Sequence, residues 1–302
     1  MKIIIAGLGR MGGQIAEMLL EGGHDVVAFN RSREPIEALQ TKGATPGFTP
    51  EEAVGAFNGE PVVVWFMVPA SVIDGMIDSW LPLLPAGSTI IDGGNSDFRG
   101  DSTRAERVSA AGSKLLDVGT SGGVWGKARG FCMMVGGDKQ HYENLRPVLD
   151  TLAAPTGAHG YFGGNGAGHY VKMVHNAIEY GMMESLAEGY RMLRDGPIEG
   201  IDLALAGDVW QQSSVITSWL NELSAEALAE SPELDGISGI VAESGEARWT
   251  LEAGKDLGIA LPSIQAAFDV RLASQNGEIN FSTKLLAAMR NKFGGHDING
   301  NQ

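Results

Sequence analysis

Five polar side chains between residues 172 and 180 recur at the spacing of one helical face. They are Lys172, His175, Asn176, Glu179 and Tyr180. A lysine and a glutamate two helical turns apart, about 10 Å along the axis, can act as base and acid on a sugar-sized substrate between them. A solvated polar face is the alternative reading, but this mixture of residue types is rarely assembled for solubility. The spacing therefore predicts a catalytic face on a helix.

A glycine-rich segment near the amino terminus lies between a predicted strand over 2–6 and a predicted helix. It reads Gly7-Leu8-Gly9-Arg10-Met11-Gly12, and a second strand follows over 24–29. In this strand–turn–helix context the first glycine allows the turn, the second admits a pyrophosphate, and the third lets helix and strand pack closely. The segment therefore predicts a dinucleotide site in which the helix amino terminus faces the phosphates.

The residues that close the second strand indicate which dinucleotide is bound. They are Asn30, Arg31 and Ser32, with no acidic side chain to accept the ribose 2′-hydroxyl of NAD. A guanidinium and a hydroxyl suit a 2′-phosphate, so we expect NADP. Arg31 could instead only stack on the adenine, in which case NAD is possible as well.

Further apolar strands alternate with helical stretches in the first half of the chain. They are expected over 62–68, 88–92, 114–118 and 131–135. This rhythm predicts an α/β fold in which a Rossmann-type, doubly wound parallel sheet occupies residues 1–162. Loops at the carboxyl ends of such strands hold ligands. One such loop contains Asn95, and another, Ser121-Gly122-Gly123, could cradle a carboxylate.

Helical patterns replace strands after about residue 160, so we expect an all-α domain over 163–302. Its first helix should run over 167–194 and carry the polar face. Val171, Val174, Ile178 and Met182 lie on its other side and are expected to pack against neighbouring elements.

Composition excludes several partner classes. The 37 acidic and 22 basic residues give a net charge of −15, which disfavours nucleic acid and anionic membranes. The longest apolar run, over 61–70, is too short to span a membrane, and no secretory signal opens the chain. The single cysteine, Cys132, excludes a Cys-rich zinc site and is expected to be buried in a strand. We expect a cytoplasmic protein that binds small molecules and no metal.

Several of these motifs resemble the 6-phosphogluconate dehydrogenase family of decarboxylating enzymes, in a short form that lacks the second half of the helical domain. The glycine segment and Asp92-Gly93-Gly94-Asn95-Ser96 are typical of the wider β-hydroxyacid dehydrogenase superfamily. More specific segments are those at 119–126, 171–182, 214–220, 248–250 and 290–296. The resemblance covers essentially the whole chain.

The resemblance implies oxidation of 6-phosphogluconate to ribulose 5-phosphate and CO₂ in the pentose phosphate pathway and in gluconate use. Lys172 would accept the proton of the 3-hydroxyl, which requires a neutral amine favoured by burial. Glu179 would protonate carbon 1 of the enediol. No metal is needed, because protonated Lys172 polarises the carbonyl. Six residues would hold the carboxylate and hydroxyls, namely Asn95, Ser121, Gly122, Gly123, His175 and Asn176.

The resemblance also assigns the substrate phosphate to Tyr180 and Arg271. Arg290 and His296 match residues that a tail inserts into the neighbouring subunit's site, which implies a homodimer with shared sites, and possible tetramers. Without the resemblance, a frayed polar tail would be the better reading of Arg290 and His296. Val68 and Asn95 fall at cofactor-binding positions.

This chain departs from the family pattern at two places. Ser244 and Glu246 stand where long forms place a phosphate-binding Lys and Thr, so phosphate binding must depend more on Arg271, Arg290 and Tyr180. Pro69 stands where long forms have a cofactor-binding Lys. Two alternatives remain from the sequence: another β-hydroxyacid dehydrogenase, of the 3-hydroxyisobutyrate or tartronate semialdehyde type, and a non-catalytic NADP sensor.

Overall fold

A computed structural model describes residues 1–298 of the chain, so the last four residues of the expected 163–302 domain lie outside it. The chain divides into two compact units, Met1–Met173 and Val174–Gln302. We call them the sheet unit and the helical unit, and describe each by itself. Among the described residues, no helix combines the length and apolar character that a membrane crossing requires.

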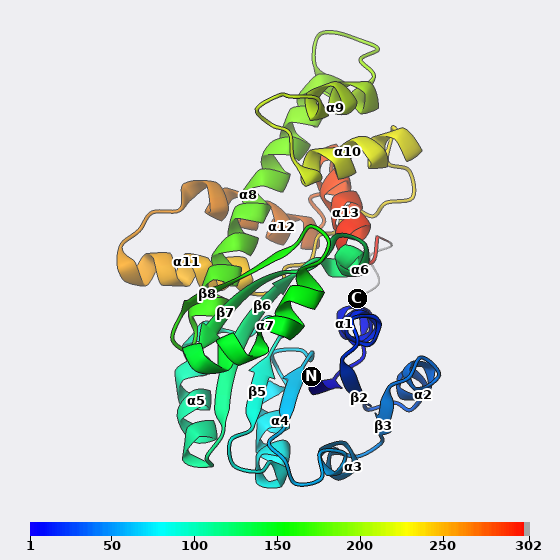
Figure 1. The fold of residues 1–302 in the computed structure, drawn as a ribbon. Coiled ribbons are helices and arrows are strands. Elements are labelled where there is room, and N and C mark those ends of the chain that lie inside the picture. Colours follow the sequence, from blue (N-terminus) through cyan, green and yellow to red (C-terminus); the bar gives the residue numbers. More distant parts are fainter. Residues whose placement is uncertain (299–302) are drawn as a thin grey trace. The chain divides into compact units, whose positions relative to one another are not determined.

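The sheet unit is built on one eight-stranded sheet of order β3-β2-β1-β4-β5-β6-β7-β8 (Figure 1). Its strands are β1 (Lys2–Ala6), β2 (Asp25–Phe29), β3 (Thr45–Gly47), β4 (Val63–Phe66), β5 (Thr89–Asp92), β6 (Lys114–Ser121), β7 (Cys132–Gly137) and β8 (Ala158–Gly163). The Rossmann-type fold expected from the alternation of strands and helices is confirmed.

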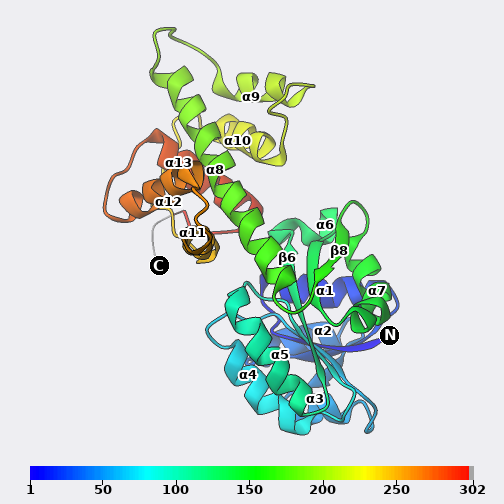
Figure 2. The ribbon, with the colours of Figure 1, turned by 90° about the vertical axis from the view of Figure 1, so that its left-hand side faces the viewer.

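Helices cover both faces of this sheet, because successive strand residues point to opposite faces. Ile3 and Ile5 of β1 contribute to one core, and Ile4 and Ala6 to the other. The first core is closed by α1 (Arg10–Glu21), α2 (Glu34–Gln40) and α7 (Lys139–Ala153). The second is closed by α3 (Pro50–Gly55), α4 (Ile73–Trp80) and α5 (Asp101–Ala110), seen together in Figure 2.

The sequence predicts a sheet that is parallel throughout, and this prediction is wrong for one pair of strands. β7 runs antiparallel to β6, with Ser121 opposite Cys132, while β8 is parallel to β7. Only residues 122–131, with the short helices η3 (Gly123–Trp125) and α6 (Gly126–Arg129), join β6 to β7. A parallel crossover needs about a dozen residues or more, so this connection reverses the chain. The three-residue strand β3 and the six-residue strand β8 were not predicted.

Cys132 is exposed, which corrects the expectation that it is buried. It is the first residue of β7, and its neighbours Phe131 and Met133 are buried instead. Met134, which shares the face of Cys132 by strand alternation, is buried, so the exposure of Cys132 belongs to the start of the strand.

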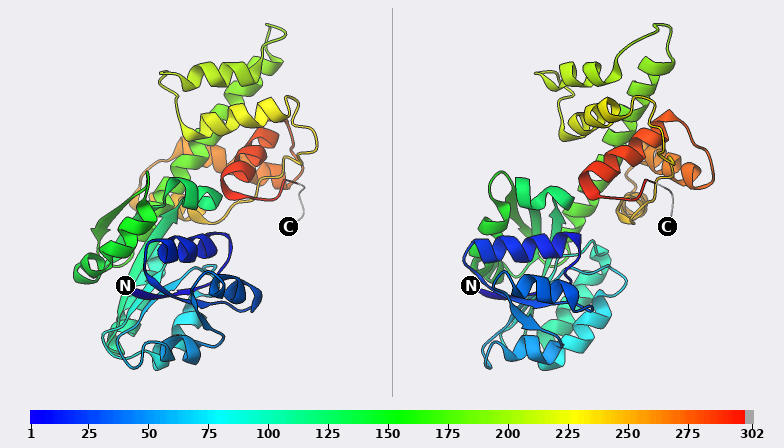
Figure 3. Two further views of the ribbon diagram at one scale, coloured as in Figure 1. Left: turned by 45° about the vertical axis from the view of Figure 1, so that its right-hand side comes forward. Right: turned by 90° about the vertical axis from the view of Figure 1, so that its right-hand side faces the viewer.

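The helical unit consists of the rest of α8 (Ala167–Asp195) and five further helices (Figure 3). These are α9 (Leu203–Gln211), α10 (Trp219–Glu230), α11 (Glu246–Leu257), α12 (Pro262–Gln275) and α13 (Phe281–Gly294). Met183, Ala187 and Tyr190 of α8 form one core with residues of α9, α10 and α13. Ala177 and Tyr180 form a second core with residues of α11 and α12.

Local sequence signals set the ends of these helices. The Ser218 hydroxyl accepts from the backbone of Asn221 at the start of α10, and Asn280 and Thr283 form a capping box at the start of α13. Gly258 and Gly295 end α11 and α13 in the left-handed conformation. The all-α second half predicted from periodicity is confirmed.

Two of the apolar side chains of α8 that we expected to pack against neighbouring elements are exposed instead. Ile178 and Met182 are 52% and 44% exposed, whereas Lys172 and Tyr180 on the polar face are 6% and 3% exposed. The polar face thus has two buried members and three partly buried ones, His175, Asn176 and Glu179, as a binding site requires and a solvated face does not.

Candidate active site

The glycine segment forms a tight turn at the end of β1. Gly7 has φ +101°, and a Cβ atom there would lie 2.4 Å from the Met67 carbonyl oxygen. A Cβ on Gly12 would lie 1.9 Å from the Gly7 carbonyl oxygen. Both positions thus require glycine to let strand, turn and helix pack closely, in agreement with the roles read from the motif.

Gly9 is a glycine for a different reason. No protein atom lies within 4 Å of the place where its Cβ would be, so packing does not demand a glycine there. It precedes α1, whose first turn has no side-chain cap and no acidic residue. Unsatisfied backbone N–H groups beside open space fit a pyrophosphate. The strand order β2-β1-β4 also places the topological switch point of the sheet beside β1, and dinucleotides bind at this point in such folds.

The end of β2 connects to this loop through Asn30. Its Oδ1 accepts from the Leu8 backbone N–H at 3.0 Å, and its Nδ2 donates to the Ser32 hydroxyl at 2.9 Å. Asn30 therefore holds the loop in shape. Arg31 is exposed and makes no ion pair among residues 1–298. Val68 lies beside the loop, since a Cβ on Gly7 would be 3.1 Å from its Cγ1.

Glycines also set the position of Lys172. A Cβ on Gly119 of β6 would lie 2.3 Å from the Cβ of Lys172, and one on Gly168 would lie 2.5 Å from the Asp117 carbonyl oxygen. The first turns of α8 thus pack directly on β6. Gly168 is required to be a glycine by this close approach. Lys172 is 6% exposed.

The loop after β6 places Ser121, Gly122 and Gly123 at the carboxyl end of that strand. Gly122 has φ +149° and Gly123 has φ +53°, which are backbone conformations that residues other than glycine rarely adopt. Gln14 of α1 donates to the Gly123 carbonyl at 3.3 Å, which joins this loop to the glycine segment. The exposed Asn95 lies at the end of β5, the neighbouring strand.

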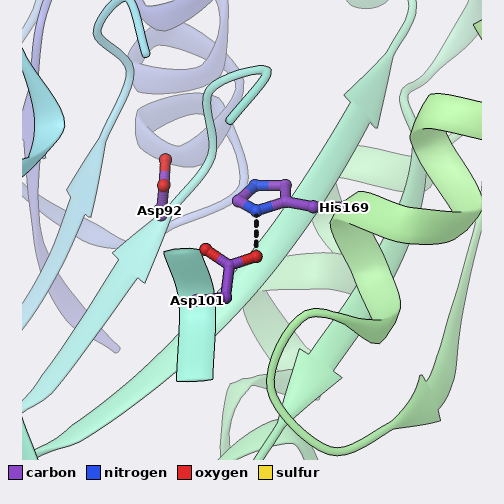
Figure 4. Close-up of side chains that lie close together, drawn as sticks. All are labelled: Asp92, Asp101 and His169. Carbon is purple, nitrogen blue, oxygen red and sulfur yellow. Dashed lines mark hydrogen bonds and ion pairs between the residues drawn. The ribbon is translucent and has the colours of Figure 1, made fainter. Parts of the chain in front are cut away.

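A buried group of charges lies at the start of α8, and we call it the paired cluster: Asp92, Asp101, Asp117 and His169. His169 Nδ1 lies 2.7 Å from Asp101 Oδ2 (Figure 4). Asp92 accepts from the Ser96 hydroxyl and the Gly94 N–H. Asp117 accepts from the backbone N–H groups of Gly166 and His169. All four are at most 2% exposed.

The paired cluster holds the first turn of α8 to β5, β6 and α5. Asp92, Asp101 and His169 place ligand atoms within 4.8 Å of one another, a spacing that could suit a metal. Their hydrogen bonds pair the acidic groups with donors, so we interpret the cluster as an ionic network. Burial alone would lower the pKa of His169, but the hydrogen bond to Asp101 and the three carboxylate charges raise it to about 9. Burial raises the pKa of Asp117.

A second buried group, the arginine cluster, consists of Tyr180, Arg271 and Arg290 in the helical unit. The Arg271 guanidinium lies 3.2 Å from the centroid of the Tyr180 ring, and the side chain is 2% exposed. Its Nη2 contacts the Met183 sulfur at 3.5 Å. Arg290 is 7% exposed. Within residues 1–298, neither arginine forms an ion pair with a carboxylate.

The arginine cluster is therefore a concentration of positive charge that no acidic side chain neutralises directly. Burial, and then the positive charge of Arg290, lower the pKa of Arg271 to about 10, while Tyr180, Glu179 and Glu184 oppose that shift. Burial lowers the pKa of Arg290 as well. Both groups stay charged at neutral pH. Two buried guanidiniums of this kind can bind a phosphate through charge-assisted hydrogen bonds.

His175 and Asn176 lie on α8 and are partly buried. His175 Nδ1 lies 2.9 Å from Asn176 Oδ1, and Asn176 Nδ2 donates to Glu246 Oε1 at 2.8 Å. Glu179 is also partly buried and interacts electrostatically with Arg271 and Arg290. His296 follows α13 and packs edge-to-face on Phe293, with ring centroids 6.2 Å apart.

Some site residues escaped the sequence reasoning. Asp101 and His169 are 68 positions apart, so only the fold pairs them. Glu184 of α8 is 7% exposed, and burial raises its pKa to about 7, with the charge of Glu188 acting in the same direction. Its position on the same helix as Tyr180, one turn further on, is the signal that could have identified it.

The described architecture agrees with known families. Residues 2–164 match the NAD binding domain of 6-phosphogluconate dehydrogenase, and residues 168–290 match the C-terminal domain of the same enzyme. The chain belongs to the 6-phosphogluconate dehydrogenase family.

Two relatives illustrate the short and long forms of this family. A Haloferax volcanii protein named NAD(+)-dependent, decarboxylating 6-phosphogluconate dehydrogenase is 37% identical over 99% of this chain and 98% of its own length. The Escherichia coli decarboxylating enzyme is 33% identical over 95% of this chain, but the match spans 64% of its length. The resemblance to a short form is thus confirmed.

Solved structures give the same fold. Plasmodium falciparum 6-phosphogluconate dehydrogenase, studied with NADP+ and with 6-phosphogluconate, has a TM-score of 0.82 and 26% identity over 96% of this chain and 70% of its own. A Mycobacterium tuberculosis 3-hydroxyisobutyrate dehydrogenase has a TM-score of 0.73 at 22% identity, over 94% of this chain and 97% of its own. At that identity the second likeness concerns the fold alone.

Proposed function

We propose that this chain converts 6-phosphogluconate to ribulose 5-phosphate and CO₂ while reducing NAD(P). The observation that carries the proposal is the arginine cluster, with Arg271 2% exposed and Arg290 7% exposed and no carboxylate paired to either within the described chain. A dehydrogenase of small unphosphorylated acids has no need to bury two unpaired guanidiniums, because burying them is costly. A sugar acid that carries a phosphate gives them a partner.

Lys172 is the proposed base of the oxidation step. Its amine accepts the proton of the substrate 3-hydroxyl as the carbon–hydrogen bond at carbon 3 breaks. A dinucleotide whose pyrophosphate is held by the glycine segment would supply the nicotinamide that takes up the hydride from carbon 3. The packing of Lys172 against Gly119 supports this role, because it fixes where the side chain leaves α8.

Decarboxylation follows from the same lysine. The 3-keto acid loses its carboxylate as CO₂, and the electron pair of that bond moves toward the carbonyl, which protonated Lys172 polarises. Lys172 donates its proton to the carbonyl oxygen, which gives the enediol. Glu179 then donates a proton to carbon 1 while Lys172 takes the hydroxyl proton back, which gives ribulose 5-phosphate. The continuous helix from Ala167 to Asp195 carries both groups seven residues apart.

The other proposed substrate contacts come from the loops and from α8. The glycine loop at Ser121, Gly122 and Gly123 would hold the carboxylate, and Asn95, His175 and Asn176 would hold hydroxyls. The phosphate would bind Tyr180, Arg271, Arg290 and His296. Arg290 interacts electrostatically with Tyr180, Glu179 and Glu246 of its own chain. Whether Arg290 and His296 serve this site or that of a neighbouring subunit stays a prediction.

NADP is the proposed cofactor, with NAD as a possible second one. The exposed Arg31 and the absence of an acidic residue at the end of β2 support a 2′-phosphate. The relative from Haloferax volcanii is named for NAD(+), and Pro69 removes one lysine contact, so this preference is the finer part of the proposal.

A homodimer is proposed from the exposed apolar side chains of the helical unit. Leu205 and Val209 of α9 are 58% and 60% exposed, and Val215 is fully exposed. Such side chains favour a protein partner over water, and a second copy would cover them symmetrically. Analytical ultracentrifugation of the wild type and of Val209→Asp tests whether the chain forms this homodimer.

A cytoplasmic location stays a prediction.

The direct test of the reaction is an assay of the purified protein with three acids and both cofactors. We expect cofactor reduction and CO₂ release with 6-phosphogluconate. We expect no cofactor reduction with 3-hydroxyisobutyrate and no oxidation of the reduced cofactor with tartronate semialdehyde. Turnover of those two acids alone would favour the alternative dehydrogenases. Cofactor binding without turnover of any acid would favour a sensor.

A further inference from the structure

A chain of hydrogen bonds in the helical unit leads from α11 to the polar face of α8. Glu246, the first residue of α11, is 2% exposed, and its Oε1 accepts from Asn176 Nδ2 at 2.8 Å. Asn176 Oδ1 in turn lies 2.9 Å from His175 Nδ1. The three side chains form one continuous series, which we call the relay: His175, Asn176 and Glu246.

The chemistry of the three groups gives the relay a direction. An ionised carboxylate can only accept hydrogen bonds, so Asn176 must turn its NH₂ group toward Glu246 and its oxygen toward His175. His175 can bond to that oxygen only if Nδ1 carries the hydrogen. In the neutral ring Nε2 is then an acceptor.

Glu246 lies near the positive charge of Arg290. Burial lowers the pKa of Arg290, and the negative charge of Glu246 acts against that shift, which places the two charges within reach of each other. Glu246 Oε2 is buried and has no hydrogen-bond partner among residues 1–298. A buried carboxylate with one orphaned oxygen is costly, and costs of this kind are typical of functional sites.

We propose that Glu246 is a positioning residue that acts through Asn176 to fix His175 as the Nδ1–H tautomer. His175 Nε2 then accepts a hydrogen bond from a substrate hydroxyl, and the second N–H of Asn176 donates to a substrate oxygen. This inference rests on the proposed function, and it specifies that a hydroxyl, rather than a carboxylate or phosphate, lies against His175. A lone pair would repel either anion.

The relay changes the interpretation of Glu246. The sequence alone indicates the loss of a phosphate contact at this position, because an acidic side chain replaces a phosphate-binding Thr of the long forms. If charge repulsion were its only effect, Glu246→Gln would lower KM for the phosphorylated substrate. If Glu246 positions Asn176, the same change lowers kcat, since the glutamine amide can present either NH₂ or oxygen and no longer fixes the direction of the relay.

Nuclear magnetic resonance of ¹⁵N-histidine-labelled protein tests the tautomer without any substrate. The chain has six histidines, and His175→Gln identifies the signals of His175. We expect the Nδ1–H form in the wild type and a mixture of tautomers in Glu246→Gln. An Nε2–H ring in the wild type, or the same Nδ1–H population in both proteins, would overturn the proposal.

Kinetics provide the second test, with a matched control on the same helix. Asp256 of α11 is exposed, so Asp256→Asn removes the same charge without touching the relay, and it should leave kcat unchanged. Glu246→Gln should lower kcat about tenfold, and little further in a His175→Gln background, because both changes break one series. Additive losses would contradict the relay. If the wild type does not oxidise 6-phosphogluconate, the proposed function fails, and the tautomer measurement still decides the positioning claim.

Discussion

The paired cluster and the arginine cluster are both built on α8, but their charges are partnered differently. In the paired cluster, Asp101 Oδ2 lies 2.7 Å from His169 Nδ1 and Asp117 accepts two backbone N–H groups. In the arginine cluster, Arg271 contacts an aromatic ring and a sulfur atom. The first cluster pairs each carboxylate with a donor and holds elements together, although His169 Nε2 is buried without a hydrogen-bond partner among residues 1–298. The second leaves strong donors for a ligand, so we interpret the charges of the first cluster as structural and those of the second as binding groups.

Lys172 sharpens this comparison, because it is a buried amine of the sheet unit for which we propose a chemical role. Lys172→Met should lower kcat about a thousandfold or more, the contribution expected of an acid–base group, while the Kd for NADP changes little. Turnover near the wild-type level would remove Lys172 from catalysis. Lys139→Met, on the exposed start of α7, serves as the control.

Asp101→Asn tests whether the paired cluster is structural. Removing one partner of a buried ion pair should lower the free energy of unfolding by about 3 kcal/mol, measured by urea denaturation. The KM for 6-phosphogluconate of the folded variant should stay near the wild-type value. A large KM change without loss of stability would show that the two clusters do not differ in kind.

Arg271→Met is the converse change in the arginine cluster. Loss of a charge-assisted contact to phosphate should raise KM about a hundredfold. Stability should be retained or improved, because an unpaired buried guanidinium is costly without its ligand. Steady-state kinetics and urea denaturation check the two halves of this prediction, and a destabilised variant with unchanged KM would contradict it.

Stability should depend on pH through His169. The pKa of His169 is raised from an ordinary 6.5 to about 9 in the folded protein, so the folded state binds the proton more tightly than the unfolded chain. The resulting stabilisation is complete below about pH 6.5 and is lost as pH rises through about 9. Unfolding free energies measured from pH 6 to 10 should fall in the wild type, and the fall should be smaller in His169→Gln.

The smallest expected effect concerns the cofactor. Arg31→Ala should weaken NADP about tenfold by removing one exposed charge near the 2′-phosphate, and should change NAD binding little. Fluorescence titration of both cofactors measures the difference. Equal losses would indicate that Arg31 stacks on the adenine and does not select the cofactor.

Residue spacing was sufficient to predict much of this molecule. The glycine segment and the length of α8 follow from local motifs and periodicity, which are properties of neighbouring residues. The direction of β7 does not, because it depends on how residues 122–131 fold back after β6. Periodicity also assigned Ile178 to packing, although this side of α8 is exposed.

The site residues also fall into two groups, those that local sequence predicts and those that only the fold brings together. Lys172 and Glu179 could be proposed from one helix, but Arg271 and Arg290 became candidates only through the family resemblance. The pairing of His169 with Asp101 and the contact of Asn176 with Glu246 join residues 68 and 70 positions apart. Contacts at such separations depend on the packing of whole elements, and no local pattern encodes them.

The central claim is that the arginine cluster selects a phosphorylated sugar acid. Its most direct test is the ratio of kcat/KM for 6-phosphogluconate to kcat/KM for gluconate, measured in the wild type and in Arg271→Met. The account predicts a ratio of at least about a hundred in the wild type, with most of it lost in the variant. Equal use of the two acids by the wild type would contradict it.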